Sequence, residues 1–291
     1  MKTRKIVLLA LIAVLVCVYA IQLVSASKTD VKKLYLDESP DEIVITKGAN
    51  ADNEVLTLRS EGENWVINDN RYPADSYEAG QIANLIKNIK VLGVVASQDI
   101  NDRYGLSVES AITAQAYKDG KLVRTISVGK SASTSQQSYI CMEGKKEVLL
   151  VSGDYSSFNT SVDSLRNRKL YSLSTGEIVG MSASTPEGTS FSIEKADGKW
   201  ENCDNDAAVS WVAGIADITV LSWAKDDEVF PAEPEGKVVI TTTKKTITME
   251  VYRFPDGSQS IGRCSETPYL FYLSNYNAEK FIKKPADLGI Q

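Results

Sequence analysis

Histidine is absent from the 291-residue sequence, and its absence excludes a large class of chemistry. Ser-His-Asp and Cys-His relays need an imidazole to carry the proton, and His-containing zinc sites need its ring nitrogen. Any acid–base chemistry would therefore depend on Asp, Glu, Lys, Tyr or Cys side chains.

Cysteine is scarce, at four residues. Cys17 lies in an apolar leader, and Cys141, Cys203 and Cys264 are far apart, with no CxxC spacing. This spacing argues against a metal knuckle. Two states of these three cysteines are possible: one disulfide with one spare thiol, or three free thiols. The sequence gives no catalytic, cofactor-binding or metal-binding residue, and we expect no cofactor.

An excess of positive charge is also missing. The formal net charge is −6, from 32 basic and 38 acidic residues. Binding to nucleic acid without sequence preference needs clustered Lys and Arg that displace counterions, so we expect no nucleic-acid partner. The hydrophobic share of 43% is ordinary for a folded globular chain.

A long hydrophobic run occurs only at the N-terminus. Basic residues within the first five positions precede an apolar run over residues 6–24. A bilayer-spanning helix needs about 20 apolar residues, and the basic flank stays in the cytoplasm. We predict a signal-anchor, a single transmembrane helix, over residues 1–26. The alternative is a signal peptide cleaved near Ala26. Both place the rest of the chain outside the cytoplasm.

A short phrase occurs twice, as GENWVIND at residues 62–69 and as DGKWENCD at residues 197–204. Each copy follows an alternating segment and a Gly turn, which predicts a β-hairpin with Trp65 or Trp200 just past the turn. We expect each Trp to hold its hairpin against the core. A ligand-stacking Trp is the alternative.

A helical pattern follows each hairpin. Residues 77–89 and 207–218 place apolar side chains at i, i+3, i+4 and i+7, and Asp75 and Asp206 are the predicted N-caps. Alternating segments come next, and we predict strands there: 111–117, 122–128, 138–142 and 147–151 in the first set, and 237–243, 246–252, 258–263 and 269–273 in the second.

The repeated order predicts an α+β fold. We expect a tandem duplication of an antiparallel-sheet unit with one main helix each, preceded by the N-terminal transmembrane helix. The first repeat covers residues 27–163, the linker 164–174 and the second repeat 175–291. Each repeat is long enough for its own core.

Three phrases carry a family resemblance: Tyr-Pro-Ala-Asp at 72–75, Tyr-Gly-Leu at 104–106 and Leu-Arg-Asn-Arg at 165–168. With them the chain resembles the DUF4340 family of bacterial envelope proteins, a domain of unknown function. The second repeat lacks Tyr-Gly-Leu. Members often occur beside ABC-transporter components of the gliding-motility type, so the resemblance implies an accessory role near such a transporter. It implies no activity, and no catalytic residue is carried over.

Charged clusters have two interpretations each. The acidic stretches 37–42 and 226–228 are either solvated loops or sites for a cation or for paired carboxylates. The basic group Arg166, Arg168 and Lys169 either pairs with carboxylates across the domain junction or contacts an anionic partner.

The sequence favours a non-catalytic, membrane-anchored extracytoplasmic accessory or scaffold protein of an ABC-type transporter system. A module that binds envelope glycan or peptidoglycan is the alternative, and exposed aromatics such as Tyr139, Tyr155 or Tyr276 would favour it. A carboxylate-dependent hydrolase is a third hypothesis. It requires two acidic residues facing across a cleft, with at least one perturbed pKa.

Overall fold

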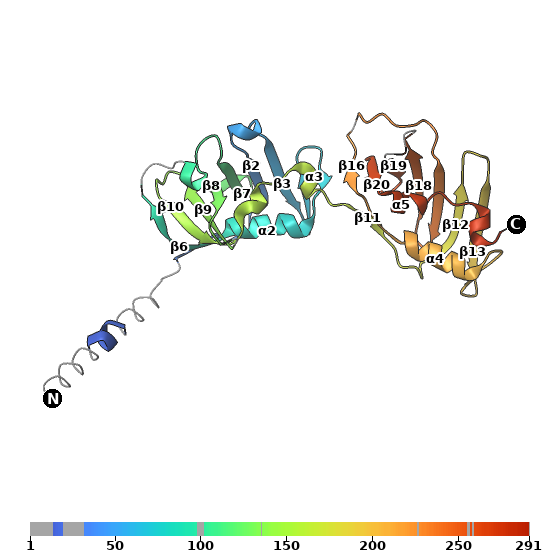
Figure 1. Ribbon diagram of the computed structural model, residues 1–291, viewed down its shortest axis with the longest axis horizontal. Helices are drawn as coiled ribbons and strands as arrows, with labels where there is room; N and C mark the ends of the chain where they lie inside the picture. The colour runs from blue at the N-terminus through green and yellow to red at the C-terminus, as the bar shows by residue number, and fades with distance from the viewer. Residues whose placement is uncertain are drawn as a thin grey trace, which may run out of the picture. The chain divides into compact units, whose positions relative to one another are not determined.

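The computed structural model describes residues 14–19, 32–97, 102–134, 136–225, 227–254, 257 and 259–290. The chain divides into two compact units, Met1–Arg166 and Asn167–Gln291. This division falls within residues 164–174, where the sequence predicted a linker. Each unit has its own sheet with a helix packed on one face, as Figure 1 shows.

The described part of the first unit contains one antiparallel sheet of ten strands. In spatial order they are β1 (Lys32–Tyr35), β6 (Asn88–Ala96), β10 (Val148–Ser152), β9 (Gln137–Met142), β8 (Lys121–Ser131), β7 (Ile112–Lys118), β2 (Glu42–Thr46), β3 (Val55–Glu61), β4 (Asn64–Ile67) and β5 (Tyr72–Pro73). Short segments η1 (Ala49–Ala51) and η2 (Asp102–Tyr104) lie in its loops.

Helix α2 (Ser76–Lys87) covers one face of this sheet. Its apolar face buries Ile82 and Ile86 completely, and each burial contributes about 2 kcal/mol. Asp75 is the N-cap, as predicted, since its carboxylate accepts from the backbone N–H groups of Tyr77 and Glu78. At the other end, Arg124 donates to the carbonyl oxygens of Ile86 and Lys87, at 2.6 and 2.9 Å. The segments η3 (Tyr155–Phe158) and α3 (Val162–Leu165) close this core.

The second unit uses the same strand order. Its described sheet of eight strands runs β14 (Lys199–Trp200), β13 (Ser190–Ala196), β12 (Ile178–Ser184), β17 (Gly236–Thr242), β18 (Thr246–Arg253), β19 (Ser260–Cys264), β20 (Phe271–Leu273) and β16 (Ser222–Trp223). The first unit has β4-β3-β2-β7-β8-β9-β10-β6 in the same places. A separate pair, β11 (Lys169–Ser172) and β15 (Asp217–Thr219), completes the unit, so part of the predicted linker is a strand.

Helix α4 (Asn205–Ile215) covers the core face of the second sheet, and the short α5 (Asn275–Glu279) and η4 (Pro285–Leu288) follow at the C-terminus. The predicted N-cap is wrong here. Asp204, with φ −67° and ψ 112°, accepts from the backbone N–H groups of Asp206 and Ala207. Asp206 is therefore already inside the first turn.

Each sheet also carries a small apolar cluster on the face away from its helix. In β9, Ile140 belongs to the main core, whereas its neighbour Cys141 packs with Leu106 and Val148. In β18, Val251 and Tyr252 divide in the same way, because successive side chains of a strand point to opposite faces. In both units the loop before β7 or β17 supplies residues to this outer cluster.

The predicted α+β class is wrong, because the fold is mainly β. Each unit has one main helix, of 12 residues in α2 and 11 in α4, against sheets of ten and eight strands in the described chain. The helical periodicity correctly predicts a helix after each hairpin. Each predicted helix extends too far, however, because Asn88 and Ile89 begin β6, and Asp217 and Ile218 lie in β15.

The described part of the structure does not show the predicted transmembrane helix over residues 1–26. Among the described residues, no helix combines the length and the apolar character needed to cross a membrane. Residues 14–19 are helical. The remainder of the predicted segment 1–26, Ala26 included, lies outside the described residues.

Candidate functional site

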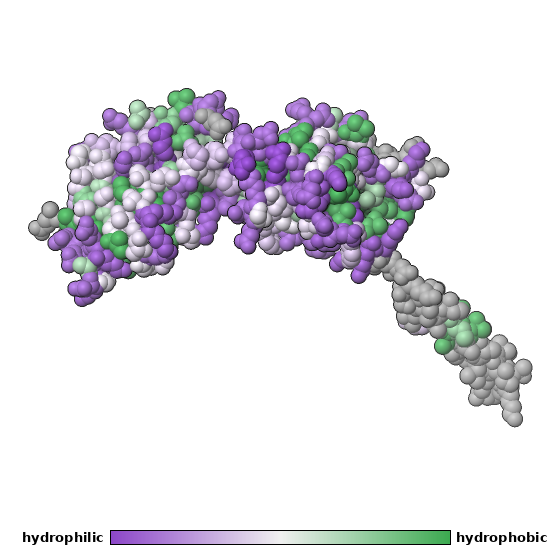
Figure 2. Space-filling view, turned by 180° about the vertical axis from the view of Figure 1, so that it is seen from behind, coloured by the Kyte–Doolittle hydropathy of each residue, from purple (hydrophilic) through white to green (hydrophobic). Residues whose placement is uncertain are grey.

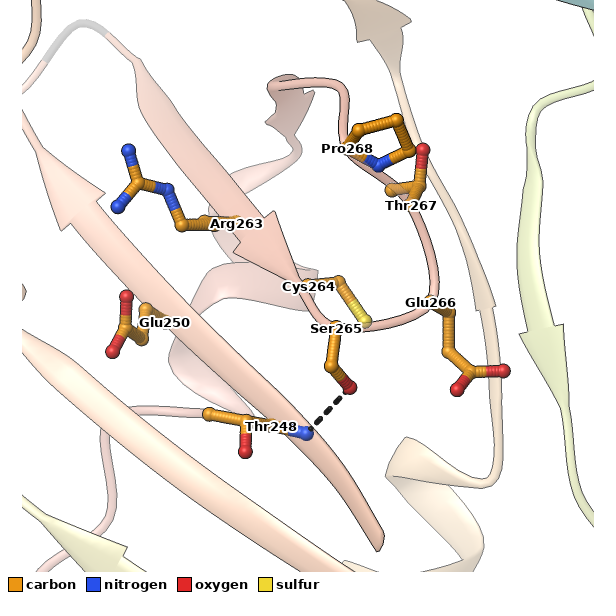
Figure 3. Close-up of a pocket in the computed structure, with 8 residues that line it drawn as sticks. All are labelled: Thr248, Glu250, Arg263, Cys264, Ser265, Glu266, Thr267 and Pro268. Atoms are coloured by element: carbon orange, nitrogen blue, oxygen red, sulfur yellow. Dashed lines mark hydrogen bonds between the residues drawn. The ribbon is translucent and has the colours of Figure 1, made fainter. Parts of the chain in front are cut away.

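An open depression of about 560 Å³ lies on the second unit at β18, β19 and the loop that follows β19. We call it the β18–β19 depression (Figure 3). Ser265 holds the loop to the strand edge, since its Oγ accepts from the Thr248 N–H at 3.0 Å and its own N–H donates to the Thr248 carbonyl. The lining residues are Thr248, Glu250, Arg263, Cys264, Ser265, Glu266, Thr267 and Pro268.

Glu250 has several polar partners in the depression. The Lys237 ammonium donates to it at 3.0 Å and the Tyr252 hydroxyl at 2.9 Å, and Arg263 stands opposite it in the β18–β19 register. Burial disfavours the ionised form, but the hydrogen bonds from Lys237 and Tyr252 and the charges of Lys237 and Arg263 outweigh it. They hold the pKa of Glu250 below its usual value. The carboxylate is therefore ionised and is a poor proton donor or acceptor at neutral pH.

The other candidate reactive groups in and around the depression are also held in structural contacts or in an unreactive protonation state. Burial raises the pKa of the Cys264 thiol to about 11, so this thiol is protonated and weakly nucleophilic. Lys245 donates to the Glu266 carboxylate. The arrangement therefore suits binding by charge and hydrogen bonds rather than acid–base or nucleophilic catalysis.

In the first predicted acidic cluster, Asp41 and Glu42 have structural partners. Asp41 accepts from the Asp119 N–H at 2.9 Å and pairs with Lys118 at 3.4 Å, which lowers its pKa. Glu42 pairs with Arg59 at 2.7 Å. In the second cluster, Asp226 lies outside the described residues. The described chain contains no group of acidic, Cys or His side chains that could hold a metal ion.

The three candidate tyrosines differ in their exposure. Tyr155 is fully buried and its hydroxyl donates to the Leu85 carbonyl at 3.0 Å. Tyr139 is half-buried and packs edge-on against Tyr104, with ring centroids 5.0 Å apart. Tyr276, in the second unit, is 77% exposed.

The two repeated tryptophans have the structural role that we expected. Trp200 belongs to the core of the second unit and Trp65 packs at the edge of the first core. Cys141, Cys203 and Cys264 are free thiols.

The phrases at 72–75 and 165–168 meet in space. The Asp75 N–H donates to the Leu165 carbonyl at 2.8 Å, and Ala74 forms a β-bridge with Arg166. The Arg166 guanidinium lies 3.9 Å from the centre of the Tyr72 ring and is buried. These residues join the end of the first unit to the start of α2.

A family model described as a domain of unknown function, DUF4340, matches residues 65–236, more than half of the chain. The chain belongs to the DUF4340 family. No curated protein and no solved structure matches it. The DUF4340 match begins inside β4 and ends at the first residue of β17, so it takes in parts of both units.

The basic group near the end of the first unit does not form one patch. Arg166 is buried on Tyr72, Arg168 is exposed, and Lys169 pairs with Asp217 at 3.1 Å inside the second unit. The remaining DUF4340 phrase, at 104–106, is also structural. Gly105 has φ +68°, and Leu106 fills the outer cluster of the first unit.

Sequence reasoning missed the β18–β19 depression. The alternation of β18 and β19 shows which side chains point outward, but not that Glu250 and Arg263 stand opposite each other. The short chain between the two strands was the available signal, because it predicts an antiparallel hairpin.

Proposed function

We propose that this DUF4340 protein is a non-catalytic accessory protein that binds a protein partner in an ABC-type transporter system. One observation carries the proposal: the β18–β19 depression is open and lined by charged and hydroxyl side chains, and its Glu250 carboxylate and Cys264 thiol are unsuited to acid–base work. The family resemblance implies the transporter, because members often occur beside ABC components.

The composition of the depression supports a protein contact. Arg263 is exposed and its guanidinium lies 5.5 Å from the centre of the Phe230 ring. Arginine and aromatic side chains are enriched where proteins bind one another. Figure 2 shows polar and apolar residues intermixed on the face of the second unit in view, which suits a reversible contact with a polar rim.

The location that we propose is outside the cytoplasm. Basic residues followed by an apolar run at the N-terminus are typical of an exported chain. A protein at that location reaches the external face of a transporter.

The test is affinity purification of the full-length protein from native membranes in mild detergent, with partners identified by mass spectrometry. We expect stoichiometric recovery of an ABC permease or ATPase. Arg263→Glu should remove most of the partner, and Lys284→Glu, at an exposed lysine outside the depression, should leave recovery unchanged. A partnerless wild-type protein, or equal recovery with both variants, would contradict the proposal.

Binding of an envelope glycan is a second candidate. The observation that favours it is the exposed Tyr276 ring, which borders a separate groove of the second unit.

A further inference from the structure

A groove of about 420 Å³ separates α4 from the C-terminal segment that contains α5 and η4. We call it the α4 groove. Trp211 lies at its base, where the indole N–H donates to the Lys280 carbonyl at 2.8 Å and fixes the C-terminal segment to the helix. Gly214 forms part of the helix wall and faces the Lys280 side chain, since a Cβ at this position would lie 4.0 Å from Lys280 Cδ.

Tyr276 borders the groove with an exposed ring. The Lys280 ammonium lies 4.5 Å from the ring centre and covers part of one face. Since 77% of the residue is accessible to solvent, the rest of the ring is open to a ligand. A single exposed tyrosine is ordinary on a protein surface. Tyr276 differs from such a residue because it lies beside a groove that contains lysines without an ion pair among the described residues.

Lys280 carries a charge that lacks a counter-ion within the described chain. Lys280 is half-buried, its ammonium donates to the Asn277 side-chain oxygen at 2.8 Å, and burial lowers its pKa. Two acids line the same groove: Glu279 pairs with Arg253 at 2.6 Å, and the Asp287 carboxylate accepts from the backbone N–H of Lys284 at 3.0 Å.

Lys283 lines the same groove and also forms no ion pair with a described residue. Two ammonium groups beside an open aromatic ring therefore favour an anionic ligand with a ring that can stack on Tyr276. Burial of an unpaired charge is costly, so an anion that joins Lys280 recovers part of that cost.

We propose that the α4 groove binds an acidic glycan, with a sugar ring on Tyr276 and its carboxylate on Lys280 and Lys283. The exposed hydroxyl groups of Tyr276 and Ser210 supply hydrogen bonds for the sugar hydroxyls. The groove volume lies within the range of small-ligand sites, about 300–1,000 Å³. This site gives the second candidate function a location and a ligand class, and it is separate from the β18–β19 depression.

The test uses the purified full chain and two probes of equal size, trigalacturonate and neutral galactotriose, with binding followed by calorimetry. We expect the acidic probe to bind in the micromolar to millimolar range and the neutral probe at least about tenfold more weakly. Tyr276→Ala and Lys280→Gln should each weaken the acidic probe by about tenfold.

Two matched controls separate the site from general surface effects. Tyr77→Ala removes an equally exposed tyrosine of the first unit, and Lys284→Gln removes a lysine of the same C-terminal segment. Neither should change the affinity. No binding of trigalacturonate, equal binding of both probes, or equal losses in the controls would overturn the proposal. The transporter proposal is unaffected by any of these results, since its test depends on Arg263.

Discussion

Gly129 shows how a single residue can decide the placement of a loop. A Cβ at this position in β8 would lie 2.2 Å from the Tyr104 carbonyl oxygen and 2.9 Å from the Leu106 side chain. The phrase Tyr-Gly-Leu therefore packs onto a strand that must present a glycine. The contact fixes the loop that covers the outer cluster of the first unit.

We expect Gly129→Ala to destabilise the first unit by about 1–3 kcal/mol, because the loop must move to make room. Gly93→Ala is the matched control, since a Cβ there meets nothing within 4 Å. It should be neutral or slightly stabilising. Hydrogen exchange of the two units during urea unfolding would measure both. Equal effects from the two variants would contradict the close approach that we describe.

Glu250 makes stability depend on pH in a defined direction. Its pKa lies below the usual glutamate value of 4.5, so the carboxylate stabilises the folded form above that pH. The contribution is lost as the pH falls through the lowered pKa. Glu250→Gln should therefore destabilise the second unit by about 1 kcal/mol at pH 7 and by much less near pH 3. Urea unfolding at both values tests this, and a difference that grows on acidification would disprove it.

The side-chain environment was the hardest feature to predict at this scale. Tyr155 and Tyr276 occur in similar phrases, Ser-Gly-Asp-Tyr and Ser-Asn-Tyr, yet one is completely buried and the other is exposed. The Tyr155 ring stacks on Phe158 at 5.8 Å and enters the core, and the Tyr276 ring points to solvent. Nothing in the local sequence distinguishes these outcomes, because they depend on packing against distant residues.

At the scale of elements, helix α4 tests the rule for N-caps. Asp204 receives two backbone N–H groups, at 2.9 and 3.1 Å, and Asp206 lies in the first turn. We expect Asp204→Ala to cost about 1 kcal/mol and Asp206→Ala only a few tenths, from its weaker interaction with the helix dipole. Chemical denaturation of both variants gives the comparison. A larger loss for Asp206→Ala would restore the N-cap predicted from the sequence.

The strands could be predicted closely from alternation, but the sheets could not. Residues 111–117 and 122–128 were expected as strands, and β7 and β8 occupy Ile112–Lys118 and Lys121–Ser131. The width of each sheet depends on pairing between distant strands, such as β2 with β7 and β12 with β17. Local periodicity carries no information on such partners. Local periodicity therefore led to the wrong fold class, and it did not reveal the β18–β19 depression or the α4 groove.

At the scale of the whole molecule, each unit has its own core. The main core of the first unit contains α2, and the main core of the second contains α4. Each cluster joins a helix to a complete sheet, so the described chain provides each unit with what a small domain needs to fold. We therefore expect residues 32–166 and 167–291 to fold as separate fragments, and circular dichroism during thermal unfolding would test each one.

The limits of the DUF4340 match have a consequence for any fragment of this protein. Residues 65–236 exclude β1, β2 and β3 from the first sheet and nearly all of β17 to β20 from the second. Strands β6, β7, β4, β12 and β16 would each lose a neighbour, and open strand edges promote aggregation. We expect this fragment to aggregate during size-exclusion chromatography. If it were monomeric, β12 and β13 would have taken the places of β2 and β3, as in a circularly permuted repeat.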